Sequence, residues 1–80
     1  MARIIDTSDT NLVGENVRKL RLQKGWSQQY LSIQLETVAV YICRGSISRI
    51  EDRSRTVTDI ELKGLAEVLG VSISDLFEGV

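Results

Sequence analysis

The chain has 80 residues, of which 42% are hydrophobic and 26% are charged, with no proline, no histidine and a single cysteine. At this length one hydrophobic core occupies most of the chain, so we expect a single small domain with little left for a separate catalytic or sensor domain. Ten basic and eleven acidic residues give a net charge of −1. This balance argues against a protein that binds polyanions through an overall positive charge.

Several site chemistries lack the residues that they need. The lone Cys43 cannot form an internal disulfide, and without histidine neither a zinc site nor a common general base can be assembled. We therefore assign Cys43 a structural role and expect no catalytic residue, no metal, no cofactor and no enzymatic activity. The longest apolar stretch, residues 38–43, is far below the roughly 20 residues of a membrane helix. We expect a cytoplasmic protein with no signal peptide and no membrane partner.

The first half of the chain predicts a flexible arm and two helices. Residues 1–10 end in a polar cluster without a clear period, which indicates an arm before a domain over residues 11–80. Apolar side chains at helical spacing predict a helix over residues 12–24, capped by Thr10 or Asn11 and ended by Gly25. Ser27 is a good N-cap for a second helix over residues 28–38. We expect Trp26 and Tyr41 to fill the core or a turn.

The second half predicts three more helices. Residues 39–43 are read as a buried turn into a short helix over residues 44–52. Thr58 and Glu61 form a capping box that opens a fourth helix, which Gly70 ends, and Ser72 with Asp75 forms a second box before a last short helix. The sequence thus predicts an all-α domain of five helices.

Charge is distributed unevenly along these predicted helices. Four arginines stand between residues 44 and 55 against two acidic residues, whereas residues 56–80 hold one lysine against five acidic residues. One surface is therefore expected to be basic and another acidic, which could orient the protein on a polyanion.

Two sequence strings carry a family resemblance. Arg21 is followed by Ser-Gln-Gln-Tyr-Leu-Ser over residues 27–32, and Gly-Ser-Ile-Ser-Arg-Ile-Glu occupies residues 45–51. Together with residues 57–62 and 69–77, they resemble the Cro/Xre family of helix-turn-helix regulators. The resemblance covers residues 12–77 and implies a compact lambda-repressor-like fold, with the helix-turn-helix formed by the second and third helices. It also implies sequence-specific binding of double-stranded DNA, with repression favoured over activation.

The resemblance also suggests which residues contact DNA. A recognition helix needs arginines and short polar side chains near its start, where it enters the major groove. Gly45 either allows close approach of the backbone or is merely tolerated on a solvent face. The expected DNA-binding residues are Gln28, Gln29, Arg44, Gly45, Ser46, Ser48, Arg49, Arg53 and Arg55. In the family pattern, Arg21 and Glu51 form a partly buried ion pair, which we assign to structure.

Some features depart from the family pattern or stay open. The turn before the third helix is longer than in the commonest members, Cys43 replaces a Ser or Thr cap, and Arg53 stands where glycine is common. We expect a homodimer on a roughly palindromic operator and no small-molecule ligand. Apolar residues 69–77 either pair with the second copy or simply close the core. The alternative function is a protein-interaction module, such as an antitoxin or adaptor, that keeps the fold without reading DNA.

Overall fold

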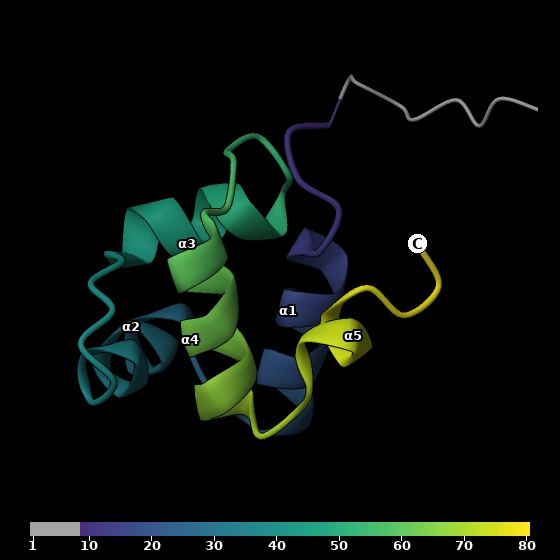
Figure 1. The fold of residues 1–80 in the computed structure, drawn as a ribbon. Coiled ribbons are helices and arrows are strands. Elements are labelled where there is room, and N and C mark those ends of the chain that lie inside the picture. The colour runs from purple at the N-terminus through teal and green to yellow at the C-terminus, as the bar shows by residue number, and fades with distance from the viewer. Residues whose placement is uncertain (1–8) are drawn as a thin grey trace, which may run out of the picture.

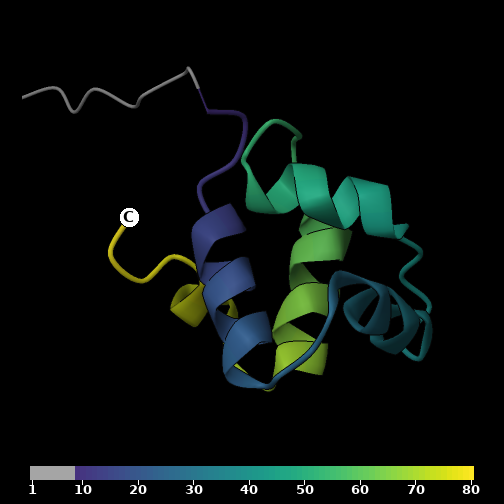
Figure 2. The ribbon, with the colours of Figure 1, turned by 180° about the vertical axis from the view of Figure 1, so that it is seen from behind.

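The structure is a computed structural model that describes residues 9–80, over which five helices form and no strand is present. The predicted all-α class is confirmed. Figure 1 and its reverse view in Figure 2 show α4 at the centre, with α1 and α5 on one side and α2 and α3 on the other. The helices are α1 (Gly14–Gln23), α2 (Gln28–Glu36), α3 (Arg44–Glu51), α4 (Asp59–Leu69) and α5 (Ile73–Leu76).

The predicted caps define the starts of three helices. The Ser27 hydroxyl accepts a hydrogen bond from the backbone N–H of Tyr30 at 3.0 Å and so caps α2. Both capping boxes are formed, by Thr58 with Glu61 at α4 and by Ser72 with Asp75 at α5. Each box satisfies two backbone donors that the helix itself leaves without a partner.

Helices α1 and α2 differ most from their predicted bounds, and α3 ends one residue before its predicted end, at Glu51. Helix α1 begins at Gly14 because Asn11 Oδ1 accepts the N–H groups of Val13 and Gly14, at 3.1 and 2.8 Å, and holds the preceding residues out of the helix. Helix α2 ends at Glu36 because Ala39 takes a left-handed conformation with φ of 61°. The longer turn is therefore accommodated as irregular backbone before α3, not as extra helix.

The core lies between the four longer helices and α5. Val40 and Ile42, from the turn before α3, are also buried in it, and the Ser32 hydroxyl donates to the Ile42 carbonyl at 2.7 Å. The irregular turn is thereby attached to α2, which sets where α3 starts. The largest fully buried side chains are Val17, Leu31, Leu35, Ile47, Ile50, Leu65, Leu69 and Leu76.

The residues before α1 are bonded to the loop after α3. Thr10 donates to the Arg53 carbonyl from its backbone N–H and its hydroxyl, at 3.0 and 2.8 Å. Asn11 Nδ2 donates to the carbonyls of Ile50 and Arg55. Thr10, assigned to the arm in the predicted division of the chain, is therefore attached to the folded part, while residues 1–8 lie outside the described residues. Within residues 9–80, no helix has the length and apolar character that crossing a membrane requires.

Candidate nucleic-acid interface

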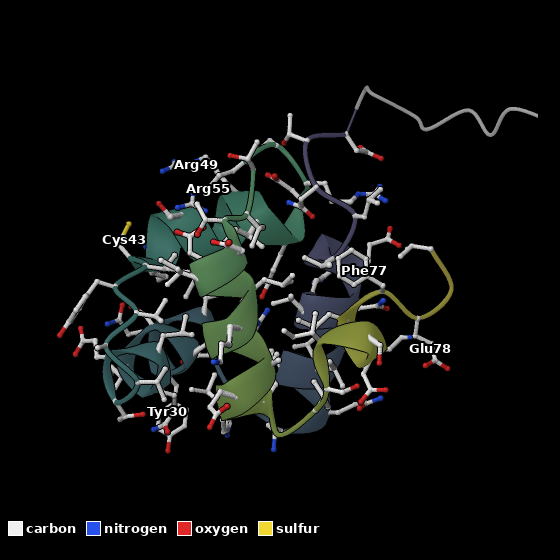
Figure 3. The ribbon with its side chains drawn as sticks, viewed as in Figure 1. Tyr30, Cys43, Arg49, Arg55, Phe77 and Glu78 are labelled. Carbon is white, nitrogen blue, oxygen red and sulfur yellow. The ribbon has the colours of Figure 1, made fainter. Side chains whose placement is uncertain are left out.

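Helix α3 presents one polar face to solvent. Ile47 and Ile50 are buried and hold the helix on the core. The opposite side of the helix carries four of the predicted DNA-binding residues, all of them exposed, and Figure 3 shows Arg49 on the outer side of α3. These four residues are Arg44, Gly45, Ser48 and Arg49.

The Ser46 hydroxyl connects the start of α3 to Arg49. Ser46 Oγ accepts hydrogen bonds from the Cys43 thiol at 3.4 Å and from Arg49 Nη2 at 3.3 Å. The contact directs the Arg49 guanidinium back toward the helix start. Hydrogen bonding between Cys43 and the side chain and backbone of Ser46 lowers the pKa of the Cys43 thiol. Cys43 is the N-cap residue, but its side chain makes no capping bond to the backbone. The first-turn N–H groups of α3 are therefore not occupied by the side chain that precedes them.

The start of α2 lies against the end of α3. Gln29 is exposed and Gln28 is half-buried. The amide nitrogen of Gln28 donates to Glu51 Oε1 at 3.1 Å. Of the first-turn N–H groups of α2, which have no partner within the helix, the one on Tyr30 is taken by Ser27. Gln28 therefore connects the start of α2 to the end of α3.

Glu51 also belongs to a buried ion pair. The structure brings together the two residues of the expected pair: Arg21 donates to both Glu51 oxygens, from Nε at 2.7 Å and from Nη2 at 2.9 Å. A third donor, Arg21 Nη1, reaches the Trp26 carbonyl at 2.6 Å. The hydrogen bonds with Glu51 raise the pKa of Arg21. The ion pair fixes α1, the turn before α2 and the end of α3 relative to one another.

A hollow between α2 and α3 adds an aromatic residue to this surface. Its volume is about 430 Å³, and Gln29 and Arg44 both line it. Tyr41 lines it as well and is 77% exposed, so the expectation that Tyr41 fills the core or a turn is wrong. Val40 and Ile42 on either side of Tyr41 are buried. This alternation of apolar residues along an extended segment is the signal that could have placed Tyr41 on the surface.

Arg53 and Arg55 are engaged in contacts within the protein. Arg55 binds the Glu61 carboxylate with both Nη atoms, at 2.9 and 2.8 Å, and this contact lowers the pKa of Glu61. Arg53 lies within 3.6 Å of both Asp9 and Glu15 and has a left-handed φ of 65°. The structure therefore does not gather these two arginines with the exposed residues of α3.

The basic surface is smaller than the number of arginines in the sequence suggests. Among residues 9–80, neither Arg44 nor Arg49 forms an ion pair, whereas Arg21, Arg53 and Arg55 all do. The basic stretch thus leaves two guanidinium groups without an ion pair among the described residues on the exposed face of α3. Hydrogen bonds from Ser54 lower the pKa of the Asp52 carboxylate, and Arg49 is near enough to help lower it. Figure 3 shows Phe77 and Glu78 on the side of the molecule away from Cys43. The acidic C-terminal end therefore leaves the start of α3 accessible.

Comparison with known proteins agrees with this geometry. A family model described as helix-turn-helix matches residues 17–76. The structure of the restriction-modification controller protein C.AhdI from Aeromonas hydrophila has a TM-score of 0.71 and 29% sequence identity, over 82% of this chain and 91% of that one. The hypothetical transcription factor NHTF from Neisseria has a TM-score of 0.72 and 28% identity, over 96% of this chain and 84% of that one. No curated protein is significantly similar in sequence. The predicted fold class and family resemblance are confirmed.

Proposed function

Because the chain belongs to the helix-turn-helix family, we propose that it is a transcriptional regulator, most simply a repressor, that reads double-stranded DNA with α3 in the major groove. The two structural neighbours, a controller protein and a transcription factor, support a DNA-binding regulator. The observation that carries the proposal is the pair of exposed arginines on α3 that form no ion pair among the described residues. Arg44 and Arg49 are exposed on a helix that is itself held by buried isoleucines.

The two arginines are suited to reading guanine. A guanidinium fork matches the O6 and N7 acceptors of guanine, and one such pair contributes about 1 to 3 kcal/mol of discrimination between bases. Arg49 is held toward the start of α3 by Ser46, which reduces the side-chain freedom that binding would otherwise remove. Gly45 adds no side chain at the same end of the helix, and we propose that this allows the backbone to approach the groove closely.

The start of α2 would contact the DNA backbone. Gln28, Gln29 and the N–H groups of the first turn can donate to one phosphate, with the positive end of the helix dipole behind them. Ser46, Ser48 and the Tyr41 hydroxyl can donate to neighbouring phosphates or base edges. Arg53 and Arg55 rank below these residues as phosphate contacts because carboxylates already hold their guanidinium groups. Such contacts set the register on DNA and carry little sequence information.

We propose that two copies bind one roughly palindromic operator, with half-sites about 34 Å apart along one face of the duplex. Of the apolar residues near the C-terminus, Leu69 and Leu76 are buried within this chain, so they close its own core. Ile73 and Phe77 remain exposed and are the residues of this group that could contact a second copy.

The test is selection of bound sequences from a random duplex library with the purified protein. The proposal predicts enrichment of a two-fold symmetric motif containing guanine in each half-site. Arg44→Ala and Arg49→Ala should then relax the preference at individual base pairs. A folded protein that enriches no sequence would refute the proposal and favour the interaction module. Enrichment of a motif without two-fold symmetry would support sequence-specific DNA binding but contradict the proposal that a homodimer binds a palindrome.

A further inference from the structure

The buried ion pair is continuous with the proposed phosphate contact. Glu51 Oε2 accepts from Arg21 Nε, and Glu51 Oε1 accepts from both Arg21 Nη2 and Gln28 Nε2. The side chains of Arg21 and Glu51 are only 8% and 4% exposed. Gln28 is half-buried at the first position of α2. A rigid, charged group inside the protein therefore touches the residue that we place on the DNA backbone.

We propose that Glu51 is a positioning residue that holds the Gln28 side chain ready for a phosphate. The inference rests on the proposed function, because Gln28 has a ligand only if α2 meets DNA. It gives the Arg21–Glu51 pair a second role besides packing α1 against α3. Sequence reasoning assigned this pair to structure alone, since Gln28 lies 23 residues from Glu51 in the chain.

The chemistry of a carboxylate determines which way the Gln28 amide faces. An ionised carboxylate only accepts hydrogen bonds, so the amide nitrogen, not its oxygen, must face Glu51. One N–H of the amide is used in that bond, and the second diverges from it and stays available for a phosphate oxygen. Arg21 holds the carboxylate in place by donating to both of its oxygens. The same contact that orients the amide thus leaves a donor free.

The Glu51 contact is expected to raise the affinity for DNA, and it does so by holding the Gln28 side chain. Immobilising a long polar side chain on binding opposes association, and a side chain that is already held avoids this cost. Losing the Glu51 contact should therefore weaken DNA binding about two- to tenfold. The loss should vanish once Gln28 is removed. A purely structural role of the ion pair predicts no such dependence on Gln28.

The experiment is a double-mutant cycle on the full chain. Arg21→Met together with Glu51→Met replaces the ion pair with apolar side chains of similar size, a change that folded proteins often tolerate. Affinity for a short random-sequence DNA duplex is measured for this pair variant, with Gln28 intact and with Gln28→Ala. Gln29→Ala is the matched control, because Gln29 is the exposed neighbour. Thermal unfolding confirms that each protein is folded under the binding conditions.

We expect the pair variant to lose affinity when Gln28 is intact, with or without Gln29→Ala, and to lose none in the Gln28→Ala background. An equal loss in all backgrounds, or no loss in any, overturns the inference. So does a Gln28→Ala protein that binds as tightly as the parent. If the parent protein binds neither this duplex nor any selected sequence, the proposed function itself has failed. The two failures are therefore distinguishable.

A second measurement needs no variant of the ion pair. In the NMR spectrum of the unmodified protein, one side-chain amide proton of Gln28 should be shifted and protected from solvent exchange relative to those of Gln29. Adding the random-sequence duplex should then shift the other Gln28 amide proton. A Gln28 amide that is indistinguishable from that of Gln29 in the free protein overturns the inference even if the pair variant fails to fold.

Discussion

Replacing Gly14 with alanine tests the contact that places α3 against α1. Gly14 is the first residue of α1, and a Cβ atom there would overlap the carbonyl oxygen of Ile50 and lie 2.9 Å from Arg53 Cγ. The clash involves backbone, so a side-chain rotation cannot remove it. The same Ile50 carbonyl accepts a hydrogen bond from Asn11 at 3.0 Å. Separating α1 from α3 would therefore also strain this bond.

The magnitude follows from these contacts. Overpacking a close contact costs about 1 to 3 kcal/mol, and a weakened hydrogen bond adds about 1 kcal/mol. Alanine is the better helix former by up to about 1 kcal/mol, which offsets part of the loss. We expect Gly14→Ala to lower the free energy of unfolding by about 2 kcal/mol, since a first-turn residue gains less than the full propensity difference. For a domain of this size the melting temperature should fall by about 8 to 16 °C.

Gly45→Ala is the matched control in the other helix of the contact. Nothing lies within 4 Å of a Cβ placed on Gly45. Because Gly45 also lies in the first turn of its helix, this variant should gain less than about 1 kcal/mol in stability. Urea and thermal unfolding followed by circular dichroism measure both variants. A Gly14→Ala protein as stable as the parent would refute the close approach. The DNA affinity of Gly45→Ala should nevertheless fall, and unchanged affinity would place Gly45 outside the contact with DNA.

Three further substitutions, one of them with a matched control, test local features. Ala39→Gly should raise the free energy of unfolding by up to about 1 kcal/mol, because φ of 61° disfavours alanine. The control is Ala66→Gly, in the buried part of α4, which should lower the free energy of unfolding in the same assay. Glu61→Gln should lower stability at neutral pH and flatten its decline in acid. The folded pKa of Glu61 lies below its ordinary value of 4.5. The stabilisation by Glu61 is therefore complete above about pH 5 and is lost as the pH falls through that lower pKa. If the variant and the parent show the same dependence of stability on pH, the Arg55 contact is contradicted. Arg55→Ala should reduce stability by about 1 kcal/mol while changing operator preference less than Arg49→Ala, measured by competition with mutated half-sites.

The starts of α2, α4 and α5 were predictable because their signals are local. Ser27, Thr58 and Ser72 each act on a backbone N–H three residues away, so a short string of sequence contains both partners. Gly70 ends α4 with φ of 71°, as its freedom from a Cβ allows. Buried positions such as Ile47 and Ile50 followed from helical spacing in the same way. Each of these features depends on a few neighbouring residues and not on how the helices pack.

Features that depend on distant partners were not predictable in this way. Asn11 was considered only as a cap, yet its Nδ2 joins the segment before α1 to carbonyls 39 and 44 residues away. Glu61 was correctly placed in the capping box with Thr58. The second use of its carboxylate, in binding Arg55, required knowledge of how the loop before α4 turns. Tyr41 was wrongly predicted to fill the core or a turn because the prediction relied on its aromatic side chain and overlooked the alternation with Val40 and Ile42, which are buried.

The charges show why a count along the sequence overestimates a binding surface. Four arginines between residues 44 and 55 suggest a broad basic face, but carboxylates hold Arg53 and Arg55 within the structure. Electrostatic affinity for DNA grows with the number of phosphates that cations neutralise. In the proposed complex Arg44 and Arg49 are directed at base edges, which leaves no cation of α3 for phosphates. The proposal therefore assigns affinity to neutral donors at the start of α2 and to two copies binding together, and both depend on geometry more than on charge.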